Sequence, residues 1–417
     1  MIDLHKIYFI LKWSTLIMII IAVGIISIPY VLNHEANLSA LVNRAFTERV
    51  TPDIIKASYA TRPIRILIVP GHDNQYSGTA ANGLREADAT LATAKYLYSF
   101  LSLNPSFTTF VTRNFTTGEY NPDFKNYFTT ESDSIEKYME SQKNLMDNFI
   151  ESGSVEGKVT NNFVTAKSEV KNRLYGINKW ANENDIDIVL HIHFNDYPGR
   201  RSDSISKYSG FSVYVPEDQL PNSRVSVDVA NSVASELQKM IAKSDMPLEK
   251  DNVIQTQELI AIGSNATRVG ASMLVEYGYI YEPQIADTKT RNLVFQEMAY
   301  RTYRGMVGYF DSKVAGVLPQ TSLLPYRFGN QIQRTSTPNT DVIRMQAALL
   351  NLGFYPPLGT TLQNCPLTGI YGNCTVKAVR EFQNKYADDI LRDEGLLYGS
   401  GIAKQKTLEK LNALLKI

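Results

Sequence analysis

About twenty consecutive residues near the N-terminus carry no charge, and this run limits where the rest of the chain can fold. It extends from Trp13 to Leu32. A helix of this length matches the hydrocarbon thickness of a bilayer, so we predict a transmembrane helix. Lys6 and Lys12 precede the run, whereas the first charged residue after it is Glu35. The positive-inside rule therefore places the N-terminus in the cytoplasm and the remainder of the chain outside.

A cleaved secretory signal is the alternative interpretation of this run, because Leu38-Ser39-Ala40 is an acceptable small-residue cleavage site. Either interpretation predicts an extracytoplasmic location in the cell envelope, where disulfides persist. We expect residues 1–34 to form a cytoplasmic stub and membrane anchor. Residues 35–61 lack a strong hydrophobic period and are predicted to form a spacer.

The charge balance and the cysteine count exclude several classes of protein. The chain has 42 Lys+Arg and 42 Asp+Glu, so its formal net charge is zero. We see no basic patch and expect no nucleic-acid partner. Two Cys cannot build a Cys-based zinc finger or an iron–sulfur site. A metal site would therefore use carboxylates and some of the five His.

Strand-like and helix-like patterns alternate between residues 62 and 315. The predicted strands are Ile64–Val69, Phe107–Thr112, Ile186–Phe194, Gly210–Val215 and Ser272–Tyr277. The predicted helices cover residues 84–101, 170–180, 225–242 and 290–310, where apolar residues recur every three or four positions. This alternation predicts an α/β layered domain.

Residues 114–170, called here the inserted segment, interrupt the alternation. They contain ten acidic residues against five lysines. Residues 133–136 read as a capping box that starts a helix, with apolar residues at helical spacing from Ile135 to Phe149. We consider two roles for the segment: a surface elaboration with a solvated charged face, or a lid or regulatory element near the active site.

Three of the five histidines lie at predicted strand ends. His72 follows the first strand after a Pro-Gly turn, and His191 and His193 end the third strand. Open α/β sheets place ligand sites at the carboxyl ends of their strands. Since side chains alternate along a strand, His191 and His193 lie on the same face. This convergence favours a metal site over isolated structural histidines, whereas His5 and His34 only flank the membrane run.

A catalytic Zn²⁺ usually takes three protein ligands and leaves one position for water, so another nearby ligand is expected. Glu86 is the best candidate because it begins the helix that follows the His72 loop. Asp88 is the competitor, although helical geometry turns it to another face. Glu276 ends an otherwise apolar strand. Charged residues in such positions are rare unless they are paired or functional.

Five sequence blocks carry a resemblance to a known family. In order, they are Val69–His72, Gly83–Glu86, Phe110–Arg113, His191–Asn195 and Leu274–Tyr279. Together they resemble the zinc-dependent N-acetylmuramoyl-L-alanine amidase family. The resemblance implies a mixed, mostly parallel sheet flanked by helices. It also implies Zn²⁺ held by His72, Glu86 and His193, with Glu276 as the catalytic acid/base.

The chain departs from this family pattern at several positions. Val69 stands where the family usually has an acid, Asp73 where it has a small residue, and His191 where Ser is common. The inserted segment is also longer than the usual connection. We expect His191, Asn195 and Arg85 to contact substrate or the ligands rather than the metal. For His191, metal ligation is the alternative.

After a polar linker at residues 316–339, residues 340–417 are predicted to form a small three-helix domain. Its helical blocks resemble the peptidoglycan-binding domain that is appended to cell-wall hydrolases. Cys365 and Cys374 bracket a short turn in this domain. We predict a disulfide between them in an oxidising compartment, with two free thiols as the alternative.

The residues alone indicate metal-assisted hydrolysis in an α/β domain. The family resemblance implies the specific reaction, which is cleavage of the amide bond between N-acetylmuramic acid and L-alanine in peptidoglycan. A zinc peptidase acting on stem peptides is one alternative. A catalytically inactive wall-binding scaffold is the other. The sequence does not identify a protein activator.

Overall fold

The computed structural model describes residues 50–157, 167–197, 199–201, 207–262, 270–329, 331–392 and 395–416. The predicted membrane anchor, with its cytoplasmic stub, lies outside these residues. Among the helices that are described, none has the length and apolar character needed to cross a membrane.

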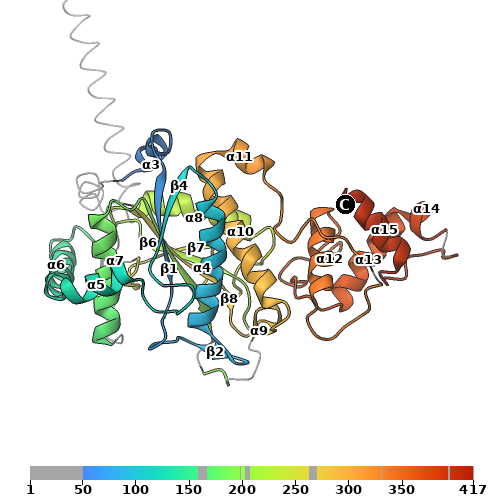
Figure 1. The fold of residues 1–417 in the computed structure, drawn as a ribbon, viewed down its shortest axis with the longest axis horizontal. Coiled ribbons are helices and arrows are strands. Elements are labelled where there is room, and N and C mark those ends of the chain that lie inside the picture. The colour runs from blue at the N-terminus through green and yellow to red at the C-terminus, as the bar shows by residue number, and fades with distance from the viewer. Residues whose placement is uncertain are drawn as a thin grey trace, which may run out of the picture.

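A six-stranded sheet forms the centre of the α/β domain, in the order β4-β1-β5-β8-β6-β7 (Figure 1). Its strands are β1 (Ile64–Pro70), β4 (Phe107–Val111), β5 (Ile188–Asn195), β6 (Ser212–Pro216), β7 (Val253–Thr256) and β8 (Ala271–Tyr279). Neighbouring strands run parallel except β6 and β8, which are antiparallel. The prediction of a mixed, mostly parallel sheet is confirmed. Strand β7 was not predicted, because its four residues are only half-buried or exposed and have no apolar alternation.

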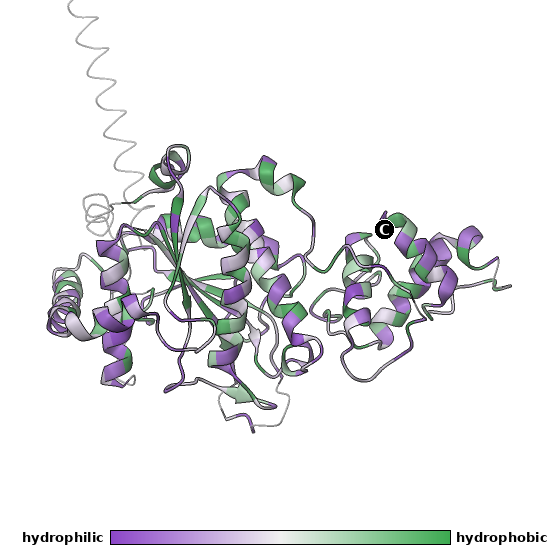
Figure 2. Cartoon of the chain, viewed as in Figure 1, coloured by the Kyte–Doolittle hydropathy of each residue, from purple (hydrophilic) through white to green (hydrophobic). Residues whose placement is uncertain are grey.

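Helices cover both faces of this sheet (Figure 1). One layer contains α4 (Glu86–Ser102), α8 (Ser223–Leu237) and α10 (Arg291–Phe310), and the other contains α5 (Pro122–Thr130), α6 (Ser132–Glu151) and α7 (Ser168–Glu183). Side chains alternate along β1, so the strand packs against both layers. Ile66 and Ile68 belong to the core under the first layer, while Leu67 and Val69 belong to the core under the second. Figure 2 shows largely hydrophobic strands between helices that also carry hydrophilic residues.

The inserted segment supplies α5, α6 and the start of α7. Phe124 of α5 is buried against the sheet together with Ile177 of α7. Ile135 of α6 is buried against Tyr175 of α7. The charged residues of these two helices are mostly exposed, as predicted for a solvated charged face, while the few buried side chains attach α5 and α6 to the domain. The two helices complete the second helical layer.

Two local predictions are wrong, one in the inserted segment and one in the spacer before the domain. The capping box does not form: α6 begins after Glu131, which makes no capping bond because the chain enters α6 directly from α5 with a backbone that is not extended. The spacer contains a helix, α3 (Pro52–Tyr59), capped by the side chain of Thr51 and with Ile55 buried. Two turns of helix are too short to show a clear hydrophobic period.

The first helix of the domain starts later than its apolar pattern indicated. It was expected from residue 84, but Leu84–Arg85 forms a strand, β3, paired with β2 (Ala80–Ala81). The hairpin brings the chain back to the carboxyl end of β1, and α4 then begins at Glu86. The third predicted helix also ends earlier, at Leu237 instead of residue 242.

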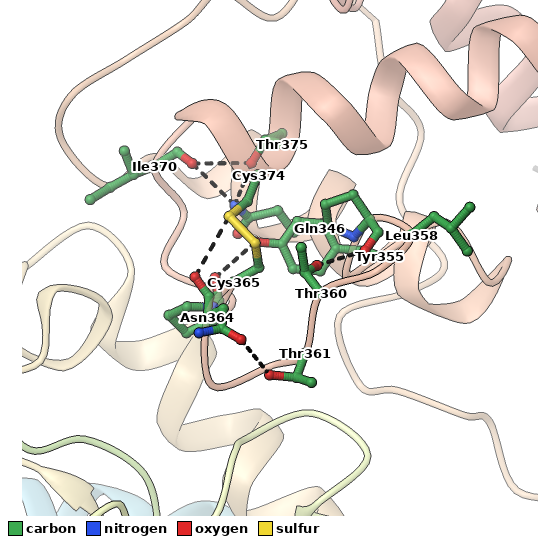
Figure 3. Close-up of a disulfide and its surroundings, with 12 residues drawn as sticks. Gln346, Tyr355, Leu358, Thr360, Thr361, Asn364, Cys365, Ile370, Cys374 and Thr375 are labelled. Carbon is green, nitrogen blue, oxygen red and sulfur yellow. Dashed lines mark hydrogen bonds between the residues drawn. A yellow bond between two sulfur atoms is a disulfide. The ribbon is translucent and has the colours of Figure 1, made fainter.

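The C-terminal module contains the three predicted helices, α12 (Thr340–Asn351), α13 (Asn373–Lys385) and α15 (Gln405–Leu414). A four-residue helix, α14 (Ala387–Ile390), lies between the last two. Cys365 and Cys374 form a disulfide with an S–S distance of 2.06 Å (Figure 3). It closes the turn before α13.

The polar linker predicted at residues 316–339 is largely packed. Its first residues belong to α11 (Ser312–Val317). Leu323, Phe328 and Ile332 are buried in the core of the C-terminal module. These three apolar residues are spaced too irregularly to predict a helix or a strand, yet each fills a place in that core.

The module is in contact with the α/β domain. Met240, which follows α8, packs into the same hydrophobic cluster as the module's core. Gln363 Nε2 donates hydrogen bonds to Asp245 Oδ2 at 3.1 Å and to Ser209 Oγ at 3.3 Å. The turn that the disulfide closes therefore lies next to Gln363, which contacts the α/β domain.

Candidate metal centre

His72, Glu86 and His193 meet at the carboxyl end of the sheet. The two oxygens of Glu86 face different imidazoles: Oε2 lies 3.0 Å from His72 Nε2, and Oε1 lies 3.0 Å from His193 Nδ1. One nitrogen or oxygen from each residue can be chosen so that all three atoms lie within 4.8 Å of one another. The structure thus brings together the three residues that the sequence singled out as ligands.

The backbone at the end of β1 allows the two histidines to approach. Gly71 N donates to Ile192 O at 2.8 Å, which extends the pairing of β1 with β5 by one residue. A Cβ at Gly71 would overlap the imidazole ring of His193. The next residue, His72, adopts a left-handed backbone conformation with φ of 62°. Non-glycine residues rarely adopt it, so neighbouring contacts must hold the loop in place.

Glu86 is fixed from several sides although it is almost completely buried. Its Oε2 accepts a hydrogen bond from Thr79 N at 3.1 Å, and its Oε1 accepts one from Phe194 N at 3.2 Å. Burial alone would raise the pKa of the Glu86 carboxyl. Its hydrogen bonds to His193 and His72 outweigh burial and lower the pKa below its ordinary value. Glu86 is therefore a carboxylate at neutral pH, as a metal ligand must be.

Arg113 joins the segments that carry His72 and Glu86, a role that was not predicted. It is completely buried, and its Nη1 donates to Ala87 O at 3.1 Å and to Gly71 O at 3.4 Å. Thr90 Oγ1 also donates to Gly71 O, at 2.8 Å. The available signal was a charged residue directly after an apolar strand, in one of the five blocks.

Glu276 lies beside His193, since the two are paired in the register of β8 and β5. Its Oε2 is enclosed and has no hydrogen-bond partner among the described residues. Burial raises the pKa of the Glu276 carboxyl well above its ordinary value, and the negative charges of Glu86 and Glu249 raise it further. A carboxyl group with a raised pKa holds its proton more firmly than an exposed one and is a candidate general acid or base.

Asn195 does not reach the cluster through its side chain. Its Nδ2 donates to Glu249 Oε1 at 2.9 Å. The same oxygen accepts from Tyr214 OH at 2.6 Å, and Tyr279 OH donates to Glu249 Oε2 at 3.4 Å. Glu249 is a site residue that the sequence did not reveal, because it lies in a loop without a motif and is placed by three distant partners.

His191 lies on the same side of β5 as His193 and lines the neighbouring cavity. It is buried, and its Nε2 has no hydrogen-bond partner in the described part of the chain. Burial and the nearby His193 lower the pKa of His191 to about 3. Its imidazole is therefore neutral at physiological pH. It does not belong to the group of three ligand atoms that lie close together.

The structure does not bring Arg85 to the metal cluster. Its guanidinium forms two hydrogen bonds with Asp88, at 2.7 and 2.6 Å, and both side chains are exposed. Neither residue lines the cavity beside the histidines. Adjacent residues at the start of a helix point in different directions, so Glu86 turns inward while Arg85 turns outward.

A cavity of about 200 Å³ opens beside His72, His193 and His191. Its remaining walls are mainly apolar and aromatic: Val170, Leu174 and Ile177 of α7, Leu259–Ala261, Leu274, Tyr76 and Tyr120. Arg173 of α7 also lines it. The cavity is thus walled partly by the helix that the inserted segment supports.

The donor set fits a catalytic zinc site. Zn²⁺ binds imidazole nitrogen at about 2.0–2.1 Å and carboxylate oxygen at about 2.0–2.2 Å, usually with three protein ligands and one open position. Two imidazoles and one carboxylate supply those ligands here, and their short separations allow them to share one ion. The adjacent cavity leaves room for a water molecule and a substrate.

Several solved structures are similar to this chain at low sequence identity. An N-acetylmuramoyl-L-alanine amidase from Clostridium difficile 630 is 16% identical, with a TM-score of 0.37, over 61% of this chain and 100% of that one. The amidase AmiC2 of Nostoc punctiforme is 17% identical, with a TM-score of 0.35, over 59% of this chain and 96% of that one. The CwlD amidase from Clostridioides difficile, in complex with the GerS lipoprotein, is 13% identical, with a TM-score of 0.38, over 60% and 99%.

A comparison with curated proteins found no match. Two sequence families do match. Residues 338–387 match a peptidoglycan binding domain. Residues 66–307, more than half of the chain, match the N-acetylmuramoyl-L-alanine amidase family and include the whole cluster of His72, Glu86 and His193. The chain therefore belongs to the N-acetylmuramoyl-L-alanine amidase family.

Proposed function

We propose that the chain is a zinc-dependent amidase in which His72, Glu86 and His193 hold the ion. Membership of the family makes it an enzyme that hydrolyses the amide bond between N-acetylmuramic acid and L-alanine. Peptidoglycan, the polymer that contains this bond, is also the partner of its C-terminal peptidoglycan-binding domain. The observation that carries the zinc assignment is the set of three ligand atoms within 4.8 Å, at a cavity and beside Glu276.

When bound, Zn²⁺ would lower the pKa of a water molecule toward about 7 and polarise the amide carbonyl. Glu276 is placed to act on the proton of that water. Its carboxylate accepts the proton as water attacks the carbonyl carbon, and the resulting carboxyl donates it to the leaving amine of L-alanine. Burial keeps the pKa of Glu276 high enough for the second step.

The test is digestion of purified peptidoglycan by the full chain in detergent with Zn²⁺, followed by mass spectrometry of the products. We expect free muramic lactyl carboxylates and new amino-terminal alanine. Cuts within the stem peptide would instead support a zinc peptidase. Products identical to those of a Glu276→Gln control would support a non-catalytic wall-binding scaffold.

We also propose that residues 13–32 anchor the chain in the membrane, with the N-terminus in the cytoplasm and both domains outside. The uncharged run and its preceding lysines support this orientation, as does the Cys365–Cys374 disulfide, since disulfides persist in oxidising compartments. Protease treatment of intact protoplasts should remove both domains. A mature chain that begins after residue 40 would instead show a cleaved signal.

A further inference from the structure

We propose that Arg173 of α7 is a positioning residue that holds the His72 loop in its metal-binding conformation. This inference rests on the proposed zinc function. His72 has a left-handed backbone, with φ of 62°, that a histidine does not favour on its own. The contacts of the residues that follow His72 must therefore fix its conformation.

Asp73 organises the loop after His72. It is nearly buried, and its Oδ1 accepts hydrogen bonds from Gln75 N and Tyr76 N, both at 2.8 Å. Its Oδ2 accepts one from Arg173 Nη1 at 2.5 Å. One oxygen thus closes the turn, while the other attaches the turn to α7.

Arg173 and its neighbours hold the loop at further points. Arg173 Nη2 donates to Gln75 Oε1 at 2.8 Å. The guanidinium also lies over the ring of Tyr76, 5.6 Å from its centroid, and Tyr76 OH donates to Glu169, one turn earlier in α7. Because the planar guanidinium has several donors in fixed directions, it can hold Asp73 and Gln75 at once.

The helix that carries Arg173 is itself firmly placed. Tyr175 and Ile177 of α7 are buried, the first against α6 and the second against α5 and the sheet. The inserted segment thereby supports the helix that holds the metal loop. The ion pair between Arg173 and Asp73 attaches the loop to this helix.

Arg173 acts through Asp73 and Gln75, since its hydrogen bonds go to them and not to a ligand atom. Losing it should free the loop without removing a ligand. Changes in residues that orient metal ligands typically cost about 10- to 100-fold in metal affinity. We expect a loss in this range for Arg173→Met.

The test measures Zn²⁺ affinity of the full metal-free chain in detergent by competition with a chromophoric chelator, together with its melting temperature. Arg173→Met should bind Zn²⁺ at least 10-fold more weakly. The matched control is Arg62→Met. Arg62, which precedes β1, forms a comparable ion pair with the nearly buried Asp187, at 2.6 Å. The control should bind Zn²⁺ like the unmodified chain.

Equal Zn²⁺ affinity of Arg173→Met and the unmodified chain would overturn the inference, as would an equal loss in the Arg62→Met control. Absence of Zn²⁺ binding by the unmodified chain is a separate outcome that would overturn the proposed function as well. If Arg173→Met does not fold, the Zn²⁺ affinities of Arg173→Lys, of Asp73→Asn and of the variant that combines both changes are compared. Non-additive losses in the combined variant support the attachment, and additive losses overturn it.

Discussion

Glu276 and His193 are direct neighbours across β8 and β5, and the enclosed Oε2 of Glu276 has no hydrogen-bond partner among the described residues. An unpaired buried carboxyl oxygen costs stability, and groups kept in this state are often functional. Glu276 lies next to three candidate metal ligands. In the proposed mechanism, the metal is held by residues locked in hydrogen bonds, and the proton is transferred by Glu276, whose Oε2 has none among the described residues.

Glu276→Gln should separate these two tasks experimentally. The amide keeps the size of the side chain but cannot accept and return a proton, so kcat should fall by about 10²- to 10⁴-fold. Zn²⁺ content should remain one ion per chain, because Glu276 is not in the group of three ligands. Metal analysis beside peptidoglycan turnover would check this. Loss of Zn²⁺ in Glu276→Gln would assign the residue to the metal site instead.

The pKa of Glu276 also predicts a pH dependence of stability for the metal-free chain. Burial and nearby negative charges raise this pKa in the folded state above its unfolded value. Between the two values the folded state therefore binds more protons than the unfolded state. Its stability must then fall as the pH rises from the unfolded pKa through the folded one.

Thermal unfolding of the metal-free chain and of Glu276→Gln from pH 4 upward would measure this contribution. The amide cannot ionise, so we expect the variant to gain stability over the unmodified chain as the pH rises. The difference between the two curves removes the effects of other titrating groups. A difference that is constant with pH would show that the pKa of Glu276 is not raised.

Gly71→Ala tests the close approach of the two histidine-bearing strands. The added methyl group would overlap the ring of His193, so the ring must move away from Glu86 and His72. We expect Zn²⁺ affinity to fall about 10-fold or more, within the range for displaced ligands. Gly316→Ala is the control, because a Cβ there meets no atom within 4 Å. Unchanged affinity in Gly71→Ala would mean that His193 does not need its observed position.

Sequence patterns located the site because its residues lie where a parallel sheet must bring them together. His72 follows β1 and His193 lies near the end of the adjacent strand β5, whose alternation fixed the side on which His193 lies. Glu86 was the best candidate because it begins the helix that follows the His72 loop, and this loop can return it to the same strand end. Each of these inferences depends on local geometry and strand order.

The remaining site residues depend on contacts between distant segments and were not predictable in this way. Arg113 and Glu249 have no spacing that marks their roles, and Arg173 lies 100 residues from Asp73, which it binds. The packing of the inserted segment was not predicted for a related reason. Its acidic composition indicated a solvated surface, which its exposed charged residues form, but the few aromatic and aliphatic residues that pack α5 and α6 are not marked by that composition.

Phe124→Ala measures how much the inserted segment contributes to the fold. Phe124 of α5 is buried at 2% exposure, in contact with the core on the second face of the sheet. Removing a buried phenylalanine side chain typically lowers the free energy of unfolding by about 3–5 kcal/mol. Leu103→Ala, at a residue that is 84% exposed, should change it by less than about 0.5 kcal/mol. Chemical denaturation of both variants would check these values. If Phe124→Ala loses no more than the control, the packing of α5 does not stabilise the fold, and α7 must be held by its contacts with α6 and the sheet.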